Sequence, residues 1–202
     1  MPPVGPSGLS RKLRWPIVFG PSRSLRRPGG RRPDDGLRHD QGCVDWLNRT
    51  QGTSVEFWGS DLKQGFNLHA NELPGEFDLV WLHPPYWNMI RYSDDVADLS
   101  ACDDYTVFRE RLRVCLGRCY TALKTGGRLA VLVGDIRRRG RYICMLQDLL
   151  NWEGELGQLK SVIIKAQHNC QSDRTRYTSL EDVPIKHEYC AVFQKPTAAV
   201  NN

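Results

Sequence analysis

The sequence lacks any apolar run that approaches the roughly 20 residues needed to cross a bilayer, so we expect no transmembrane helix. Its basic N-terminus lacks an apolar stretch followed by a small-residue cleavage site, which predicts that no secretory signal peptide is present. The seven cysteines are odd in number and include no Cys-x-x-Cys pair. These absences indicate a reduced, cytoplasmic protein whose cysteines are mostly small core residues.

Most of the chain also lacks an excess of positive charge. Residues 1–40 contain nine lysines and arginines against three acidic residues, whereas residues 41–202 contain nineteen against twenty. The formal net charge of +5 therefore comes from the N-terminal segment. Overall charge gives no argument that the body of the protein binds nucleic acid.

The N-terminal segment has little periodicity. Residues 1–40 are rich in proline, glycine and arginine, and only WPIVFG (15–20) has the pattern of a strand. This composition predicts a segment that lies outside the compact fold, with the possible exception of that strand. We expect one folded domain at residues 41–196, followed by a short tail at 197–202, and we find no internal repeat.

Strand and helix patterns alternate beyond residue 40. Strand patterns occupy residues 54–61, 77–82, 127–135, 159–167 and 187–195, and helix patterns occupy residues 44–50, 104–123 and 142–154. A glycine C-cap is expected after the second of these helices, at the sequence KTGG. The alternation predicts an α/β fold with a mostly parallel sheet, which binds ligands at the carboxyl ends of its strands.

Polar residues stand at the ends of three of these expected strands. They are Asp61, His83 and Asp135. We expect these strand ends to line one edge of the sheet, where chemistry is expected. A helix N-cap or a solvated strand end is the alternative interpretation of both aspartates.

His83 opens the sequence His-Pro-Pro-Tyr-Trp, which ends at Trp87. Two prolines make a stiff turn whose carbonyl groups can point at one place, because proline fixes φ and donates no hydrogen bond. Together with a polar side chain they can accept both protons of an exocyclic amine, and Tyr86 can stack on a planar ring. The alternative is a structural turn that caps a buried strand.

The stretch FDLVWLHPPYW resembles the catalytic motif of the DNA amino-methyltransferases. That motif is Asp, Asn or Ser, then Pro-Pro, then Tyr, Phe or Trp, at the end of a strand, and His83 departs from it at the first position. LKTGGRLAVLVGD is similar to the strand that follows the motif in this family. SVIIKAQHN and IKHEYCAVFQK are similar to its closing strands. The resemblance covers roughly residues 41–196.

The resemblance implies a Rossmann-like methyltransferase fold, with a seven-stranded, mostly parallel sheet and an antiparallel last strand. It implies S-adenosylmethionine as the cofactor, DNA as the partner, and methylation of N4 of cytosine or N6 of adenine, as in restriction–modification systems. The amine would attack the sulfonium methyl directly, with no covalent intermediate. The residues that would hold the amine and support the turn are His83, Pro84, Pro85, Tyr86 and Trp87.

A neutral His83 can replace the Ser or Asn acceptor of the family motif, because one nitrogen of the neutral ring carries a lone pair. Asp61 matches the acidic position that contacts the adenine of the cofactor, and Ser60 and Leu62 are its neighbours.

A basic run, RRRGR (137–141), follows Asp135. It is either a solvated loop or a contact with DNA phosphates. The residues proposed for nucleic-acid binding are Arg137, Arg138, Arg139, Arg141 and Lys165. Gln167 and Asn169 follow Lys165 in the sequence and could face the same cleft.

The glycine-rich cofactor loop of the family is not recognisable. Residues 17–42 should contain it, but arginine and proline stand where small and apolar residues belong. One hypothesis is that this segment is a methyltransferase motif translated in a shifted reading frame. The gene would then encode a small-residue loop in the second frame and a compensating shift near codon 42.

Three other functions stay open at this stage. An RNA base N-methyltransferase would use the same fold, and a catalytically inactive remnant could still bind nucleic acid. A zinc site is the third possibility, with His168, Cys170, His187 and Cys190 as ligands.

Overall fold

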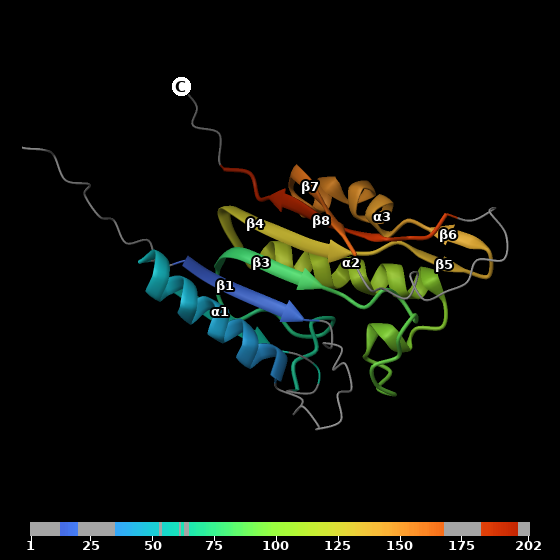
Figure 1. Ribbon diagram of the computed structural model, residues 1–202, viewed down its shortest axis with the longest axis horizontal. Coiled ribbons are helices and arrows are strands. Elements are labelled where there is room, and N and C mark those ends of the chain that lie inside the picture. Colours follow the sequence, from blue (N-terminus) through green and yellow to red (C-terminus); the bar gives the residue numbers. More distant parts are fainter. Residues whose placement is uncertain are drawn as a thin grey trace, which may run out of the picture.

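The computed structural model describes residues 13–19, 35–52, 54–60, 62, 65–167 and 183–197, with only the backbone described for 13–19 and 35–40. Six strands form one sheet in the order β2-β1-β3-β4-β8-β7 (Figure 1). Their bounds are Leu13–Phe19 (β1), Val55–Ser60 (β2), Phe77–His83 (β3), Leu123–Val133 (β4), Gln158–Ala166 (β7) and His187–Gln194 (β8).

The strand directions follow the sequence-based prediction. Strands β2, β1, β3 and β4 are parallel to one another. Strand β8 is antiparallel to both of its neighbours, β4 and β7. The expected Rossmann-like α/β fold, with a mostly parallel sheet and an antiparallel last strand, is confirmed. The described residues contribute six strands to this sheet, one fewer than the seven that the family resemblance implies.

Part of the N-terminal segment belongs to the sheet. The strand expected at residues 15–20 is present as β1, and it pairs with β2 on one side and β3 on the other. Helix α1 spans Asp35–Gln51, so the expected boundary at residue 41 falls inside a helix. An acidic residue at its first position favours a helix start there, because the N-terminal end of a helix carries a partial positive charge. The Asn48 side chain exchanges two hydrogen bonds with the Val55 backbone, which ties α1 to β2.

Helix α2 spans Tyr105–Thr121 and begins at an N-cap, Asp104, whose side chain accepts hydrogen bonds from two backbone N–H groups of the first turn. The expected glycine C-cap is wrong, since the chain passes directly from Ala122 into β4 and KTGG lies within that strand. The Lys195 ammonium instead donates hydrogen bonds to the carbonyls of Tyr120, Thr121 and Leu123.

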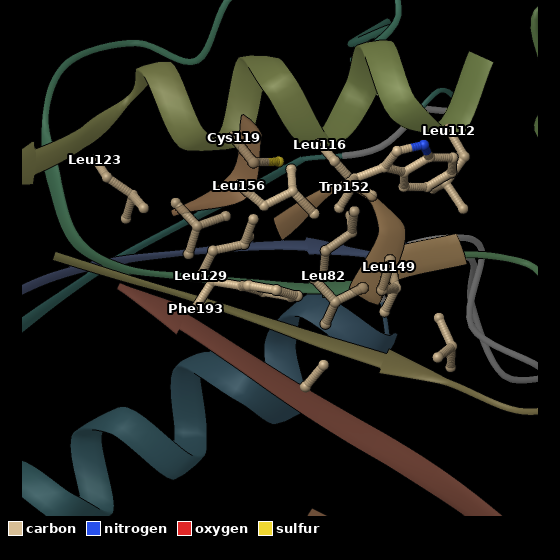
Figure 2. Close-up of a cluster of buried hydrophobic side chains, with 14 of the residues drawn as sticks. Leu82, Leu112, Leu116, Cys119, Leu123, Leu129, Leu149, Trp152, Leu156 and Phe193 are labelled. Carbon is tan, nitrogen blue, oxygen red and sulfur yellow. The ribbon is translucent and has the colours of Figure 1, made fainter. Parts of the chain in front are cut away.

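The main core lies between α2 and the sheet (Figure 2). Leu112, Leu116 and Cys119 recur at helical spacing on α2 and are at most 2% exposed. They pack with buried residues of three strands and of two short helices, α3 (Met145–Asn151) and α4 (Glu153–Leu156). Burial raises the pKa of the Cys115 thiol to about 12, so this cysteine is a protonated core residue, as the sequence indicates.

The other face of the sheet carries a smaller apolar cluster. Ala130, Leu132 and Cys190 are buried there. Helix α1 lies on this face, opposite α2, and the views in both figures agree on this arrangement. Among the helices in the described ranges, none has the length and apolar character needed to cross a membrane.

The basic run at 137–141 is a β-hairpin and not a loop. Strands β5 (Ile136–Arg138) and β6 (Arg141–Ile143) pair antiparallel as a separate two-stranded sheet. Arg139 and Gly140 form the turn with φ angles of 50° and 75°, as two-residue hairpin turns require. The helix expected at residues 142–154 is therefore shorter at its start, and Trp152 divides it into α3 and α4.

Candidate active site

The strand order reverses between β1 and β3. From β1 the chain passes to β2 on one side, and β3 then pairs with the other side of β1. Phe19, the last residue of β1, is paired with His83, the last residue of β3. Open α/β sheets bind ligands at such a reversal, outside the carboxyl ends of the strands. The topology therefore places the Pro-Pro turn beside the position where a Rossmann-like sheet binds its ligand.

The expected cofactor-binding residues lie one strand further along this edge. Ser60 is the last residue of β2 and is paired with Val18 of β1. Ser60 and Leu62 are both half-buried. Asp61 lies outside the described residues, as do residues 20–34, which hold the degenerate glycine-rich loop. The shifted-frame hypothesis stays a prediction.

The turn after β3 is anchored by its aromatic end. Pro84 and Pro85 are buried. Trp87 has a positive φ of 51°, a conformation that costs a bulky residue of the order of 1–3 kcal/mol. Its indole N–H donates a hydrogen bond of 2.8 Å to the Cys102 carbonyl, and its ring packs edge-on against Tyr105. These contacts hold the strained turn against the segment that precedes α2.

Tyr86 points back into the protein. Its hydroxyl donates a hydrogen bond of 2.6 Å to Oε1 of Glu188, and its ring lies directly over Gly134. A Cβ atom at position 134 would lie 2.7 Å from Cε2 of Tyr86, so only glycine fits there. Burial, together with the bond to Glu188, raises the pKa of Tyr86 far above its usual range. The hydroxyl therefore stays protonated as a donor.

Glu188 is the site residue that sequence reasoning missed. It lies on β8, is only 6% exposed, and its Oε2 atom accepts a hydrogen bond of 2.6 Å from the Lys165 ammonium on β7. Burial alone would raise the pKa of Glu188, but the hydrogen bonds from Lys165 and Tyr86 hold it below its usual value. The signal in the sequence was a carboxylate inside an apolar closing strand, since a buried charge needs a partner.

His83 lies at the other end of this set of contacts. Its Nε2 atom is 3.0 Å from the Tyr86 hydroxyl. Burial lowers the pKa of His83 and the Lys165 charge lowers it further, against an opposing effect of Glu188. The imidazole is therefore neutral at neutral pH.

A cleft of about 770 Å³ opens beside the turn. Trp87 and Asn88 line it on one side, and the N-terminal end of α2, the hairpin and α3 line the rest. The Asn88 Oδ1 atom is buried and has no hydrogen-bond partner among the described residues. The position of the cleft beside the turn, with three arginines in its lining, makes it a candidate ligand site.

The structure separates the five residues proposed for nucleic-acid binding. Arg138, Arg139 and Arg141 line the cleft. Arg137 donates a hydrogen bond to the Val183 carbonyl and lies over the Tyr142 ring. Lys165 forms the ion pair with Glu188.

Asp135 holds together the chain segments that surround it. Its carboxylate is buried and accepts hydrogen bonds from the Tyr142 hydroxyl (2.6 Å) and from the backbone N–H of Met145 (3.0 Å). It therefore satisfies a first-turn N–H of α3 from outside the helix, whose own N-cap residue is Cys144.

The two candidate zinc ligands that lie in the described residues, His187 and Cys190, give the zinc hypothesis no support. His187 Nε2 lies 2.7 Å from the Tyr189 hydroxyl, and Cys190 is buried in the smaller cluster. His168 and Cys170 lie outside the described residues. Within the described ranges, no group of three His, Cys, Asp or Glu side chains could hold a metal ion.

Solved structures with similar folds include methyltransferases. A Thermus thermophilus protein, named "Putative DNA Modification Methylase" and complexed with S-adenosyl-L-methionine, is 23% identical, with 67% of this chain and 53% of that one covered and a TM-score of 0.45. The N-methyltransferase NodS from Bradyrhizobium japonicum, in complex with S-adenosyl-l-homocysteine, is 12% identical, with 92% and 79% covered and a TM-score of 0.45. The chain spans about half the length of the first of these proteins. No protein-family model matches the sequence, and neither does a curated protein.

Proposed function

We propose that this chain is an S-adenosylmethionine-dependent methyltransferase that acts on an exocyclic amine of a DNA base, N4 of cytosine or N6 of adenine. The observation that carries the proposal is the pairing of Phe19 with His83. It brings the end of the first strand and the Pro-Pro turn together where the strand order reverses, which is where a Rossmann-like sheet binds its ligand.

The described residues fit the cofactor. When bound, S-adenosylmethionine supplies an electrophilic methyl group on a positively charged sulfur. A protonated imidazole at the strand end would repel that charge, but His83 is held neutral by burial. Ser60 and Leu62, half-buried at the end of β2, would lie against the adenosine part, and Asp61 follows Ser60 in the sequence.

His83 orients the amine in this proposal. An exocyclic amine of cytosine or adenine is poorly basic, and its proton leaves after methyl transfer, so orientation matters more than proton removal. A neutral ring nitrogen and the carbonyl groups of the turn are acceptors for the two amine protons. The hydroxyl of Tyr86 is occupied by Glu188, so this residue would contribute its ring and not its hydroxyl group to base binding.

The cleft beside Trp87 would hold the nucleic-acid backbone next to the turn, because neither His83 nor Tyr86 lines it. Its arginines on the hairpin would contact phosphates. Phosphate contacts of this kind predict binding that weakens steeply as the salt concentration rises.

Isothermal titration with S-adenosylmethionine, followed by transfer of a labelled methyl group to DNA and to RNA of matched sequence, tests the proposal. We expect cofactor binding and label on DNA. Label on RNA alone would assign the chain to the RNA base N-methyltransferases. Absence of cofactor binding would leave an inactive nucleic-acid-binding remnant and overturn the proposal.

A further inference from the structure

A continuous set of hydrogen bonds connects the turn after β3 with strands β8 and β7. The His83 Nε2 atom lies 3.0 Å from the Tyr86 hydroxyl, and that hydroxyl lies 2.6 Å from Oε1 of Glu188. The other carboxylate oxygen, Oε2, lies 2.6 Å from the Lys165 ammonium. The Glu188 carboxylate thus contacts Tyr86, a residue 102 positions earlier in the sequence.

The chemistry of these groups fixes the direction of each bond. An ionised carboxylate only accepts hydrogen bonds and an ammonium group only donates them. Glu188 therefore receives the Tyr86 proton on one oxygen and a Lys165 proton on the other. The Tyr86 oxygen then faces His83 with a lone pair, so the proton of the imidazole must be on Nε2. The remaining ring nitrogen, Nδ1, keeps its lone pair.

We propose that Glu188 and Lys165 are positioning residues that act through Tyr86 to hold His83 as the Nε2–H tautomer, with the Nδ1 lone pair available for the target amine. The role of that lone pair rests on the proposed function, whereas the tautomer itself does not. The pair is suited to the task because Lys165 keeps the buried carboxylate ionised. Without the ammonium, Glu188 would tend to take up a proton and could donate to the Tyr86 oxygen, which would reverse the chain of bonds.

The charged and titratable groups that face this set come from three elements. Glu188 and Lys165 act on His83 from β8 and β7, and Tyr86 and Tyr92 belong to the turn region after β3. Lys165 is 59% exposed, so its ammonium reaches the carboxylate from the surface, while Glu188 is buried. Substitution at Lys165 therefore leaves the core packing in place.

Long-range ¹H–¹⁵N spectra of the full chain at pH 8 test the inference without any substrate. The chain has five histidines, and comparison with His83→Asn identifies the ring signal of His83. We expect the Nε2–H pattern in the wild type. In Glu188→Gln, the Lys165 ammonium donates to the amide oxygen, and the amide NH₂ group donates to the Tyr86 oxygen. The Tyr86 hydroxyl then donates to Nε2 of His83, so the His83 signal should move to the Nδ1–H pattern.

Lys165→Met is the surface variant that keeps the test decisive if Glu188→Gln fails to fold. It should also move the His83 signal toward Nδ1–H. The matched variant Lys160→Met should not, because among the described residues the Lys160 ammonium bonds to Gln158 on its own strand and not to this set. An Nδ1–H wild type, or a His83 signal unmoved by both Glu188→Gln and Lys165→Met, would overturn the inference.

Methyl-transfer kinetics separate this inference from the proposed function. If the wild type transfers methyl groups, Lys165→Met should lower kcat by about 10²-fold, the size of effect that a misplaced reacting group produces, with little change in KM for the cofactor. A wild type that transfers no methyl group would sink the proposed function while leaving the tautomer result to stand or fall by the spectra.

Discussion

The two sides of the strand reversal differ in how they are built. On the side of β3, β4 and β8, the residues His83, Tyr86 and Glu188 are joined by hydrogen bonds, and the Tyr86 ring packs over Gly134. On the side of β1 and β2, the proposed cofactor site would depend on Ser60, Leu62 and the loop that follows β1, where the sequence has arginine and proline in place of small residues. The β3 side, where the target amine would bind, is thus held by contacts between residues far apart in the sequence. The β1 side, where the cofactor would bind, depends on a glycine-rich loop whose pattern is not recognisable in this sequence.

The largest effect should come from removing β1. A chain that starts at residue 35 would lose the strand that pairs with both β2 and β3, which leaves β2 without a neighbour in the described sheet. We expect this chain to lose cooperative thermal unfolding, measured by circular dichroism. A chain that starts at residue 13 keeps β1 and should unfold as the full chain does. Equal melting temperatures for the two truncated chains would show that residues 13–34 add nothing to the stability of the fold.

Substitutions at His83 test the proposed binding of the target amine. His83→Leu removes both ring nitrogens and should lower methyl-transfer kcat by about 10²-fold, as expected for the loss of a positioned hydrogen-bonding group. His83→Asn keeps an acceptor at similar reach and should retain much of the activity. If both variants are equally inactive, the acceptor role is wrong.

The pH dependence sharpens the same point. Burial lowers the pKa of His83 from its usual value of 6.5, so wild-type activity should be constant near pH 7 and should fall as the pH drops below 6.5 and through the lowered pKa. The unfolded chain binds this proton more readily than the folded one, so the stability that a neutral His83 contributes is present above pH 6.5 and lost below it. His83→Asn should lack the acidic limb in rate and should show a smaller fall in melting temperature, since the pKa of His69 is lowered by burial as well. Persistence of the acidic limb in rate would mean that another group titrates.

Gly134→Ala tests whether Tyr86 is held by packing. The new Cβ would lie 2.7 Å from the Tyr86 ring, and overpacking of this kind costs about 1–3 kcal/mol of unfolding free energy. Gly154→Ala is the control, because a Cβ atom there meets nothing within 4 Å and alanine is the better helix residue. Chemical denaturation of the two variants measures the difference. Equal stabilities would mean that Tyr86 moves aside at no cost.

The parts of the molecule that the sequence predicted are those with a local signal. Strand β3 was visible as an apolar run, and the spacing of apolar residues on α2 was visible as a helix pattern, although the glycine C-cap expected for that helix was wrong. The hairpin was missed because Arg139 gave no sign that it would take a positive φ next to Gly140. Glu188 was missed as a partner of Tyr86 because a contact between residues 102 positions apart leaves no periodic trace.

The smallest effect we predict concerns the end of α2, where the expected glycine cap is replaced by the side chain of Lys195, the residue that follows β8. The Lys195 ammonium lies 2.8 Å from the Leu123 carbonyl, 3.2 Å from that of Thr121, and 5.1 Å from the centre of the Tyr120 ring. A cation at this position satisfies carbonyl groups that the helix leaves unpaired and complements their partial negative charge. Lys195→Met keeps the apolar stem and removes the charge, so it should cost about 1 kcal/mol, which corresponds to a fall in Tm of about 2–4 °C for a chain of this size. Lys160→Met removes a lysine whose ammonium bonds to a side chain of its own strand and should leave Tm unchanged. If the two variants have the same Tm, the carbonyls at the end of α2 are satisfied by water, and their contact with Lys195 contributes nothing to stability.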